Sequence, residues 1–253
     1  MTESAKLPRK PIGCFHGINV DVIFHHAIGA ATDTLVITIP EKRAMLSTRH
    51  GYKETDVICN CHVPRELWDY MHDESRSWQE TYGQIMKEVL DELGTTIEDI
   101  AFLSTGLKQE RVAWSKEIYD EFWVLALTTA GVKTNAMRIG KDKASGIERH
   151  GKFEKIGTIN TIVFTNAILE PPALASSFIT ITEAKNVALQ ELDIRSAYHP
   201  EWLATGTGTD QIIVVSGLEH KYTYVGGHTK LGEMIATAVT QSTIDAIKNS
   251  RGF

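Results

Sequence analysis

The segment ATGTGTDQIIVVSG, residues 204–217, leads from a run of glycine and threonine through one aspartate into a short apolar stretch. That stretch, QIIVVS (211–216), is rich in β-branched residues and therefore predicts a short buried strand. A second glycine-rich segment, YVGGHTKLGE (224–233), leads into an amphipathic pattern that predicts a helix over 228–250. Glycine and hydroxyl residues in these places indicate either ordinary turns or the rim of an active site.

Strands and helices alternate outward from this segment. Apolar residues recur every four positions over 77–96, and Gly94 follows them, so we expect a helix there. A second helix is predicted over 171–192, where two prolines occupy the first turn. We therefore expect one domain over 1–253, an α/β or α+β fold with a mixed β-sheet covered by helices. The other predicted strands are 33–40, 44–48, 56–63, 97–106, 121–131 and 155–166.

The composition is that of an ordinary globular protein, with 42% hydrophobic and 23% charged residues among 253. A net charge of -6 gives no support for nucleic-acid binding, which favours a basic surface. No apolar run reaches the length of about 18 residues that a membrane span needs. The first residues lack the apolar stretch of a signal peptide, and three cysteines do not make a disulfide framework. We therefore expect a cytoplasmic protein that binds neither membrane nor nucleic acid.

Small polar residues follow several of the predicted strands, as in FLSTG (102–106), ALTTAGVKTNA (126–136) and TIVFTN (161–166). Ligands commonly bind beyond strand ends, where hydroxyl and amide groups can donate to a developing oxyanion. The alternative is that these residues only form turns. The candidate residues from these segments and from the 204–210 run are Ser104, Thr129, Asn135, Asn160, Asn166 and Thr207.

Charged residues near the two predicted C-terminal helices are the second group of candidates. His228 stands where the last helix is expected to begin, and an imidazole there could act as a general base or as a simple turn residue. Glu183 and Lys185 interrupt a largely apolar helix, so Glu183 either has a partner or faces solvent. Asp210 could orient a histidine or an amine, or cap a turn. Lys230 and Glu233, in the first turn of the last helix, are further candidates for substrate contacts.

Metal and phosphate motifs are weak in this sequence. Alternation along a strand would place Cys59 and Cys61 on one face next to His62, but no second cysteine pair accompanies them. The spacing of His16, His25 and His26 matches no known ligand pattern either. The phosphate-binding pattern GxxxxGK[ST] is absent. We therefore predict no metal site and no protein-bound cofactor.

Several ordered blocks of the chain resemble the adenosylcobinamide amidohydrolase family. Two blocks, TTAGVKTNAMRIG (128–140) and GTINTIVFTNAILEPPALASSFITITEAKNVALQELDI (157–194), are similar to that family's central motifs. ATGTGTDQIIVV (204–215) and GGHTKLGEMIA (226–236) resemble its last two. The resemblance covers about 44–253, and it is looser over residues 44–64 and 101–106.

The resemblance implies an enzyme that hydrolyses the amide between the corrin propionyl side chain and aminopropanol, giving adenosylcobyric acid for cobamide salvage. We assign His228 as general acid or base, oriented by Glu183 or Asp210. The attacking group is water or a hydroxyl, for which Ser104, Thr129 and Thr207 are candidates. The remaining predicted substrate contacts are Asn135, Asn160, Asn166, Lys185, Lys230 and Glu233. Any metal would belong to the small-molecule substrate, and a homo-oligomer is left open.

The sequence departs from the family pattern in places that would select a substrate. Lys133 and Thr134 both intervene before Asn135, RHGYKETD (49–56) replaces a glycine-rich segment, and 65–95 is strongly altered. Two alternatives therefore remain. The chain could hydrolyse an amide or ester of another metal chelator, such as a ferric siderophore, or bind a metal-containing cofactor without catalysis.

Overall fold

The structure is a computed structural model that describes residues 6–71, 76–144 and 158–251. The chain divides into two compact units. Unit one contains the described residues up to Lys42 together with Thr55–Glu110. Unit two contains Arg43–Glu54 and the described residues from Arg111 onward. The hairpin of strands β3 and β4 therefore contributes residues to both units.

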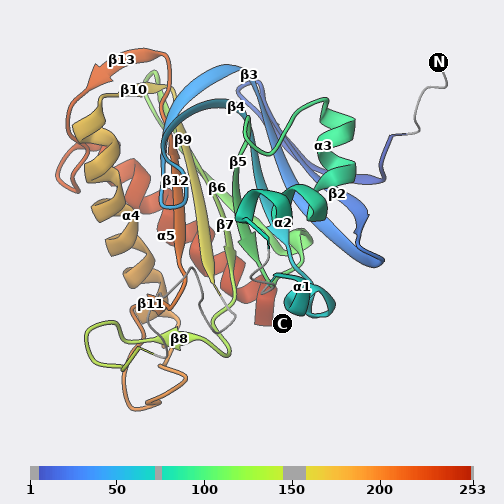
Figure 1. The fold of residues 1–253 in the computed structure, drawn as a ribbon. Coiled ribbons are helices and arrows are strands. Elements are labelled where there is room, and N and C mark those ends of the chain that lie inside the picture. Colours follow the sequence, from blue (N-terminus) through green and yellow to red (C-terminus); the bar gives the residue numbers. More distant parts are fainter. Residues whose placement is uncertain (1–5, 72–75, 145–157, 252–253) are drawn as a thin grey trace. The chain divides into compact units, whose positions relative to one another are not determined.

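Unit one is built on antiparallel strands followed by short helices (Figure 1). Strand β2 pairs with β1 on one side and with β3 on the other, both antiparallel, and β5 runs parallel to β4. Its elements are β1 (Arg9–Phe15), β2 (Ile18–Ala27), β3 (Ala30–Ser47), β4 (Gly51–His62), η1 (Arg65–Leu67), α1 (Trp68–Met71), α2 (Trp78–Ile85), α3 (Lys87–Leu93), β5 (Ala101–Thr105) and η2 (Gln109–Arg111).

Helices α2 and α3 cover the sheet of unit one. Tyr82, Ile85 and Val89 come from this helical segment and are buried in one apolar cluster with residues of β2, β4 and β5. Ser77 begins α2 with a capping box, in which its hydroxyl accepts from Glu80 N while the Glu80 carboxylate accepts from Ser77 N. The hydrogen bond that the Glu80 carboxylate accepts from the Ser77 backbone, followed by an interaction with the Ser77 side chain, lowers the pKa of Glu80.

Unit two contains a mixed sheet in the order β3–β12–β9–β7–β6, to which β3 contributes its last residues. Strand β12 is parallel to β9, whereas the other neighbouring pairs in this order are antiparallel. Its elements are β6 (Ala113–Tyr119), β7 (Phe122–Ala130), β8 (Ala136–Met137), β9 (Ile159–Thr165), β10 (Ala167–Leu169), α4 (Pro171–Glu191), β11 (Gly206–Thr207), β12 (Gln211–Val215), β13 (Glu219–Tyr222) and α5 (Lys230–Arg251).

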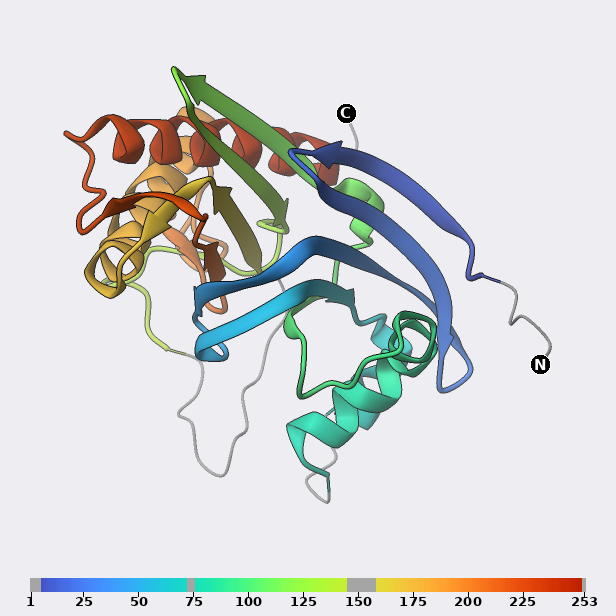
Figure 2. The same cartoon turned by 90° about the horizontal axis from the view of Figure 1, so that it is seen from above.

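Helices α4 and α5 lie next to each other on one face of this sheet (Figures 1 and 2). The Thr240 hydroxyl of α5 donates to the carbonyl of Ala184 in α4 at 3.2 Å, which joins the two helices directly. Alternate residues of β7, β9 and β12, such as Val163 and Val214, are buried against them in one apolar cluster. This packing consequently fixes the strand ends at Gln211 of β12 and Ala130 of β7 relative to α4.

The structure confirms a mixed β-sheet covered by helices, and it changes several element boundaries. The helix predicted over 77–96 is divided at Met86, whose φ of -96° and ψ of 12° lie outside the helical region. The strands predicted over 33–40 and 44–48 are one continuous strand, β3, which pairs with β2 over its first part and with β12 at its last residues. The strands that were not predicted are β1, β2, β6, β8, β10, β11 and β13. Residues 155–157 of the strand predicted over 155–166 lie outside the described residues.

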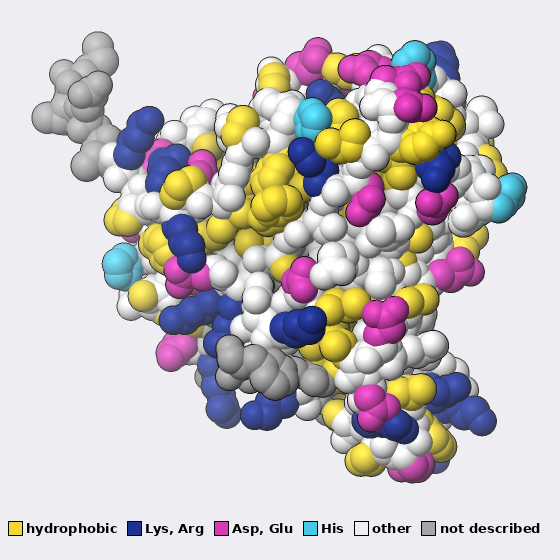
Figure 3. Space-filling model, turned by 180° about the vertical axis from the view of Figure 1, so that it is seen from behind, with side chains coloured by type: hydrophobic (Ala, Val, Ile, Leu, Met, Phe, Trp, Pro, Cys, Tyr) yellow, Lys and Arg dark blue, Asp and Glu magenta, His cyan; other side chains and the backbone are white. Residues whose placement is uncertain are grey.

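The surface mixes residue types. Lys and Arg side chains occur beside Asp and Glu side chains on the face shown in Figure 3, with apolar patches between them. Within the described part of the chain, every helix is too short or too polar to cross a membrane.

Candidate active site

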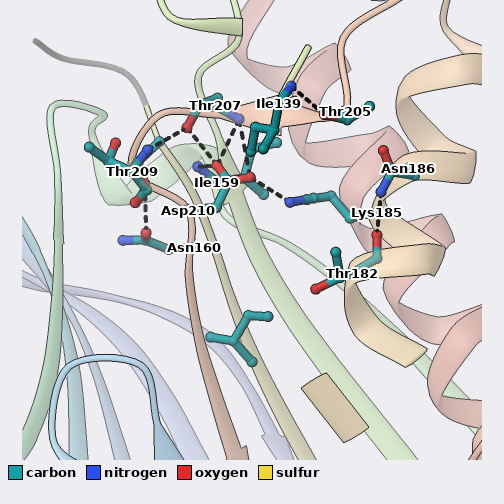
Figure 4. Close-up of polar contacts among 12 residues, drawn as sticks. Ile139, Ile159, Asn160, Thr182, Lys185, Asn186, Thr205, Thr207, Thr209 and Asp210 are labelled. Atoms are coloured by element: carbon teal, nitrogen blue, oxygen red, sulfur yellow. Dashed lines mark hydrogen bonds and ion pairs between the residues drawn. The ribbon is translucent and has the colours of Figure 1, made fainter. Parts of the chain in front are cut away.

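Asp210 is the centre of a polar cluster in unit two, at the turn that precedes β12 (Figure 4). Its Oδ1 accepts hydrogen bonds from the backbone N of Ile159, at 3.1 Å, and from the Thr207 hydroxyl, at 2.5 Å. The backbone N of Thr207 lies 3.1 Å from both carboxylate oxygens. These donors come from β9 and β11, so the carboxylate joins two strand ends.

Lys185 supplies a positive charge to the same carboxylate. Its Nζ lies 2.6 Å from Asp210 Oδ2, and the two side chains are only 9% and 14% exposed. Lys185 occupies the buried face of α4 between Ala184 and Ala188, so the helix directs it toward the sheet. An ammonium group in such a place needs a counter-ion, because burying an unpaired charge is costly.

Thr207 is held by a short ladder between β11 and β8, in which it pairs with Ala136. It is buried, and its hydroxyl proton points to the Asp210 carboxylate. Gly206 makes this arrangement sterically feasible: a Cβ there would lie 2.4 Å from Asp210 Oδ2 and 2.9 Å from Lys185 Nζ. Gly206 therefore has a packing role beside the carboxylate.

Three other predicted residues lie around this end of the sheet. Thr129 and Asn160 are buried cross-strand neighbours on β7 and β9. The Thr158 hydroxyl lies 3.1 Å from Asn160 Oδ1 and 2.5 Å from the carbonyl of Thr209, next to Asp210. Asn135 is buried just before β8, close enough that a Cβ on Gly208 would lie 3.5 Å from its Oδ1.

Asn166 lies at the opposite end of β9 from Asn160 and has partners of its own. Its Oδ1 accepts from the backbone N of Trp123, at 3.0 Å. Its Nδ2 donates to the carbonyl of Glu121 and to the carboxylate of Glu219, both at 2.8 Å. The side chain thus fixes the turn between β6 and β7 to β13.

His228 is placed away from Asp210. Asp210 directly precedes β12, whereas His228 follows β13, which pairs with β10 beyond the far end of β9. The His228 ring is exposed and lies 5.6 Å from the Tyr224 ring. Glu183, the other proposed partner, is exposed on α4. The structure therefore does not support orientation of His228 by Asp210, and the catalytic role of His228 stays a prediction.

Lys230 and Glu233 lie in the first turn of α5, near His228, and pair with each other. Lys230 Nζ is 2.8 Å from Glu233 Oε2 and 4.7 Å from the centre of the Tyr119 ring. The hydrogen bond to Glu233 raises the pKa of Lys230. Both residues are exposed, so they form a surface ion pair in the first turn of the helix.

Ser104 belongs to unit one, on β5. Its Oγ accepts a hydrogen bond from the Tyr82 hydroxyl at 2.7 Å. The partner comes from α2, so the contact joins helix and sheet within that unit. A structural role for Ser104 is therefore visible, while its predicted role as nucleophile stays a prediction.

The cysteine and histidine residues of unit one have structural surroundings. Cys59 and Cys61 are buried in its apolar cluster, and burial, followed by the proximity of Cys61, raises the pKa of the Cys59 thiol. His62 Nδ1 lies 3.4 Å from a carboxylate oxygen of Asp33. Among the described residues, no three His, Cys, Asp or Glu side chains are arranged to hold a metal ion.

Sequence reasoning named Lys185, Thr207 and Asp210 separately but missed that they form one cluster. It also missed Gly206, Thr158 and Gln211, which contact or adjoin it. A general signal for Gly206 was present, because glycine is common where the backbone is closely approached by another group. No local signal indicated the Lys185–Asp210 pair, since 25 residues separate its members.

Comparison with known proteins gives two related sequences. The chain is 48% identical over 227 residues to the uncharacterized protein MJ1613 of Methanocaldococcus jannaschii, which covers 85% of this chain and 86% of that protein. It is 34% identical over 106 residues to the adenosylcobinamide amidohydrolase of Methanosarcina mazei, covering 38% of this chain and 49% of that enzyme. Among solved structures, the PH0078 protein from Pyrococcus horikoshii OT3 is similar over 92% of this chain and 84% of its own, with 12% identity and a TM-score of 0.43.

A family match extends across both units. Residues 20–253 match the family described as adenosylcobinamide amidohydrolase, so the chain is a hydrolase that acts on amide bonds. It belongs to the adenosylcobinamide amidohydrolase family. The match begins earlier than the sequence resemblance, which covered about 44–253.

Proposed function

We propose that this protein hydrolyses the amide between the propionyl side chain of a corrinoid and aminopropanol. Adenosylcobinamide would be the substrate, and adenosylcobyric acid and aminopropanol the products. The observation that carries this proposal is the family match over residues 20–253. The name of the Methanosarcina mazei relative supports the same substrate class.

Thr207 is the hydroxyl best placed to attack the amide carbonyl. Its Oγ1 donates to Asp210 Oδ1 at 2.5 Å, so the carboxylate can receive the proton as the C–O bond forms. The acyl group then stays on Thr207 as an ester while the amine leaves with a proton. Water, activated by the same carboxylate, hydrolyses that ester and restores the threonine.

Lys185 would supply the positive charge that such a site needs. Its ammonium lies beside Asp210 Oδ2 in surroundings from which most water is excluded, where charge interactions are stronger than in bulk water. It can stabilise the oxyanion of the tetrahedral intermediate or donate to the departing nitrogen. The expected result of Lys185→Met is therefore lower turnover together with loss of the Asp210 counter-ion.

The test is a mass-spectrometric assay of the purified protein with adenosylcobinamide. We expect release of aminopropanol and a corrinoid carboxylic acid, and a loss of at least about a hundredfold in turnover for both Thr207→Val and Asp210→Asn. Thr182→Val, at an exposed position of α4, is the matched control and should keep wild-type turnover. Normal turnover in Thr207→Val would remove that residue from the mechanism while leaving the substrate assignment intact.

The substrate assignment is tested in the same assay with ferric siderophores. If a siderophore amide or ester is cleaved while adenosylcobinamide stays intact, the corrinoid proposal is wrong. If the protein retains a corrinoid unchanged, hydrolysis is wrong and binding without catalysis replaces it. A covalent adduct on the peptide containing Thr207, absent from Thr207→Val, would support the ester intermediate directly.

A further inference from the structure

Unit one contains a pocket on the face of its sheet that α2 and α3 cover. The pocket has a volume of about 430 Å³, which is in the range of small-molecule binding sites. It is lined by Leu93, the last residue of α3, and by residues of β1, β2 and β3. Gly94 takes a φ of 64° and ends the helix, so α3 stops at the edge of the pocket.

The side of the pocket next to α3 is apolar. Ile23 of β2 and Val36 of β3 are buried in the apolar cluster of unit one, and Leu93 packs against this cluster. Asp21 of β2 is in register with Pro11 of β1 and with Val36 of β3. Because residues two apart on a strand share a face, Asp21 lies next to Ile23 in the floor of the pocket. A ligand can therefore place an apolar group on this side while another of its groups reaches the carboxylate.

One acidic and one basic side chain line the pocket, and of these two the basic one has a counter-ion. The Arg9 guanidinium donates to the carboxylate of Glu92 in α3, which also accepts from the backbone N of Leu7 at 2.5 Å. Asp21 is half-buried, and its carboxylate makes no hydrogen bond or ion pair with any residue in the described part of the chain. The charge left to be paired is negative, so the ligand that complements this pocket carries a positive charge.

The side of the pocket away from α3 is polar. Asn19 of β2 and Thr38 of β3 both line it and are in register with each other. They lie one row beyond Asp21 on the same face, a distance of about 7 Å along the strands. Neither side chain is hydrogen-bonded to another of the described residues. An amide and a hydroxyl are therefore available to a ligand whose positive group is at Asp21.

We propose that this pocket is a binding site for a small amine that carries a hydroxyl and an apolar side chain, that is, for an amino alcohol. The ammonium group pairs with Asp21, and the hydroxyl bonds to Asn19 and Thr38. The apolar side chain lies on the α3 side of the pocket, against Ile23. All the lining residues belong to unit one, and none belongs to the candidate active site of unit two. The inference therefore goes beyond the proposed amide hydrolysis and does not rest on it.

Cys14 provides the readout for the test, because it is exposed and lines the same pocket, whereas Cys59 and Cys61 are buried. The purified protein is treated with iodoacetamide in the presence of leucinol, and labelling of the peptide that contains Cys14 is followed by mass spectrometry. We expect leucinol to slow this labelling in a saturable manner. Isohexanol, which is the same molecule without the amine, should bind about tenfold or more weakly, because it cannot pair with the carboxylate.

Two substitutions test the assigned contacts. Asp21→Asn keeps the shape of the side chain and removes its charge, so leucinol should bind about tenfold or more weakly. Asp56→Asn is the matched control, because Asp56 is also a half-buried aspartate on a strand of unit one but does not line the pocket, and the affinity should stay unchanged. Thr38→Val should weaken the binding of leucinol more than that of the same amine without its hydroxyl.

Calorimetric titration with the same ligands gives the affinity without relying on the thiol. Equal binding of leucinol to Asp21→Asn and to the wild type, or no binding of leucinol to the wild type, would overturn the inference. Tighter binding of isohexanoate than of leucinol would also overturn it, because Arg9 and not Asp21 would then be the group that pairs with the ligand. Failure of the protein to hydrolyse adenosylcobinamide would affect the proposed function alone, since the two measurements are separate.

Discussion

Gly206 is the residue whose lack of a side chain leaves room for the Lys185–Asp210 pair. A Cβ at this position would lie 2.4 Å from Asp210 Oδ2, and Cβ atoms in proteins essentially never approach another atom so closely. We expect Gly206→Ala to push the carboxylate away from Lys185, lowering kcat/KM by about tenfold or more and the free energy of unfolding by about 1–3 kcal/mol. Steady-state kinetics and urea unfolding measure both effects.

Gly208 offers the matched control two residues away. A Cβ there would lie 3.5 Å from Asn135 Oδ1 and from the sulfur of Met137, which is an ordinary van der Waals distance. Gly208→Ala should therefore be tolerated in both assays. Equal losses in the two variants would mean that flexibility of the segment, and not room for the carboxylate, explains its glycines.

At this scale the sequence indicated the kinds of residues but not their grouping. Thr207 and Asp210 are close in sequence and lie before a recognisable strand, so their proximity could be predicted. Lys185 joins them only because α4 packs on the sheet with its buried face turned toward β12. His228 was singled out because it stands where the last helix was expected to begin, yet that helix starts after β13, away from Asp210.

Among the elements, α2 and β5 are connected by one polar contact within unit one. The Tyr82 hydroxyl donates to Ser104 Oγ at 2.7 Å, and Tyr82 also packs against the Phe102 ring at 4.8 Å between centres. We expect Tyr82→Phe and Ser104→Ala each to lower the free energy of unfolding by about 0.5–1.5 kcal/mol. The double variant should lose little more than either single one, because both remove the same hydrogen bond.

Turnover of the same variants separates the two roles considered for Ser104. A structural hydrogen bond predicts that Tyr82→Phe and Ser104→Ala change turnover to the same small extent. If Ser104 supplied the nucleophile, Ser104→Ala alone would abolish turnover. The comparison therefore uses Tyr82→Phe as the control for the loss of the contact.

Element boundaries were predicted less well than element types, and the reasons are local. The apolar pattern over 77–96 continues through Met86, and none of the residue types around Met86 predicts a break in the helix. Strand β3 contains Glu41, Lys42 and Arg43, which look like a turn because they are charged and follow a proline. They remain in the strand because pairing with neighbouring strands is a tertiary interaction that local composition does not record.

For the whole molecule, the division into two units was not visible in the sequence. Domain boundaries are usually sought in Gly-, Ser- or Pro-rich linkers, and this chain has none. The chain instead passes between the units within β3, within β4 and a third time in η2, between Glu110 and Arg111. In β3 and β4 strand residues continue across the boundary without a change of composition. The prediction of one domain over 1–253 stays a prediction, while the mixed sheet with covering helices is confirmed.

Acid should destabilise the protein through His25 of unit one. His25 is 3% exposed, its Nε2 lies 2.9 Å from the Thr34 hydroxyl, and its Nδ1 has no hydrogen-bond partner among the described residues. Burial lowers its pKa below the ordinary 6.5, although an interaction of the ring with the backbone of His26 and the charges of Glu88 and Asp33 act in the opposite direction. The folded protein therefore keeps this imidazole neutral at pH values where the unfolded chain is already protonated.

Because the unfolded chain binds more protons between the lowered pKa and 6.5, the free energy of unfolding falls as the pH drops through that window and is fully retained above it. We expect the urea midpoint to fall between about pH 7.5 and about pH 5.5, and His25→Gln to show a smaller fall. His199→Gln, at an exposed position, should keep the wild-type slope. If His25→Gln and the wild type lose stability in parallel, the acid sensitivity arises from other groups, and His25 is protonated in the folded state without penalty.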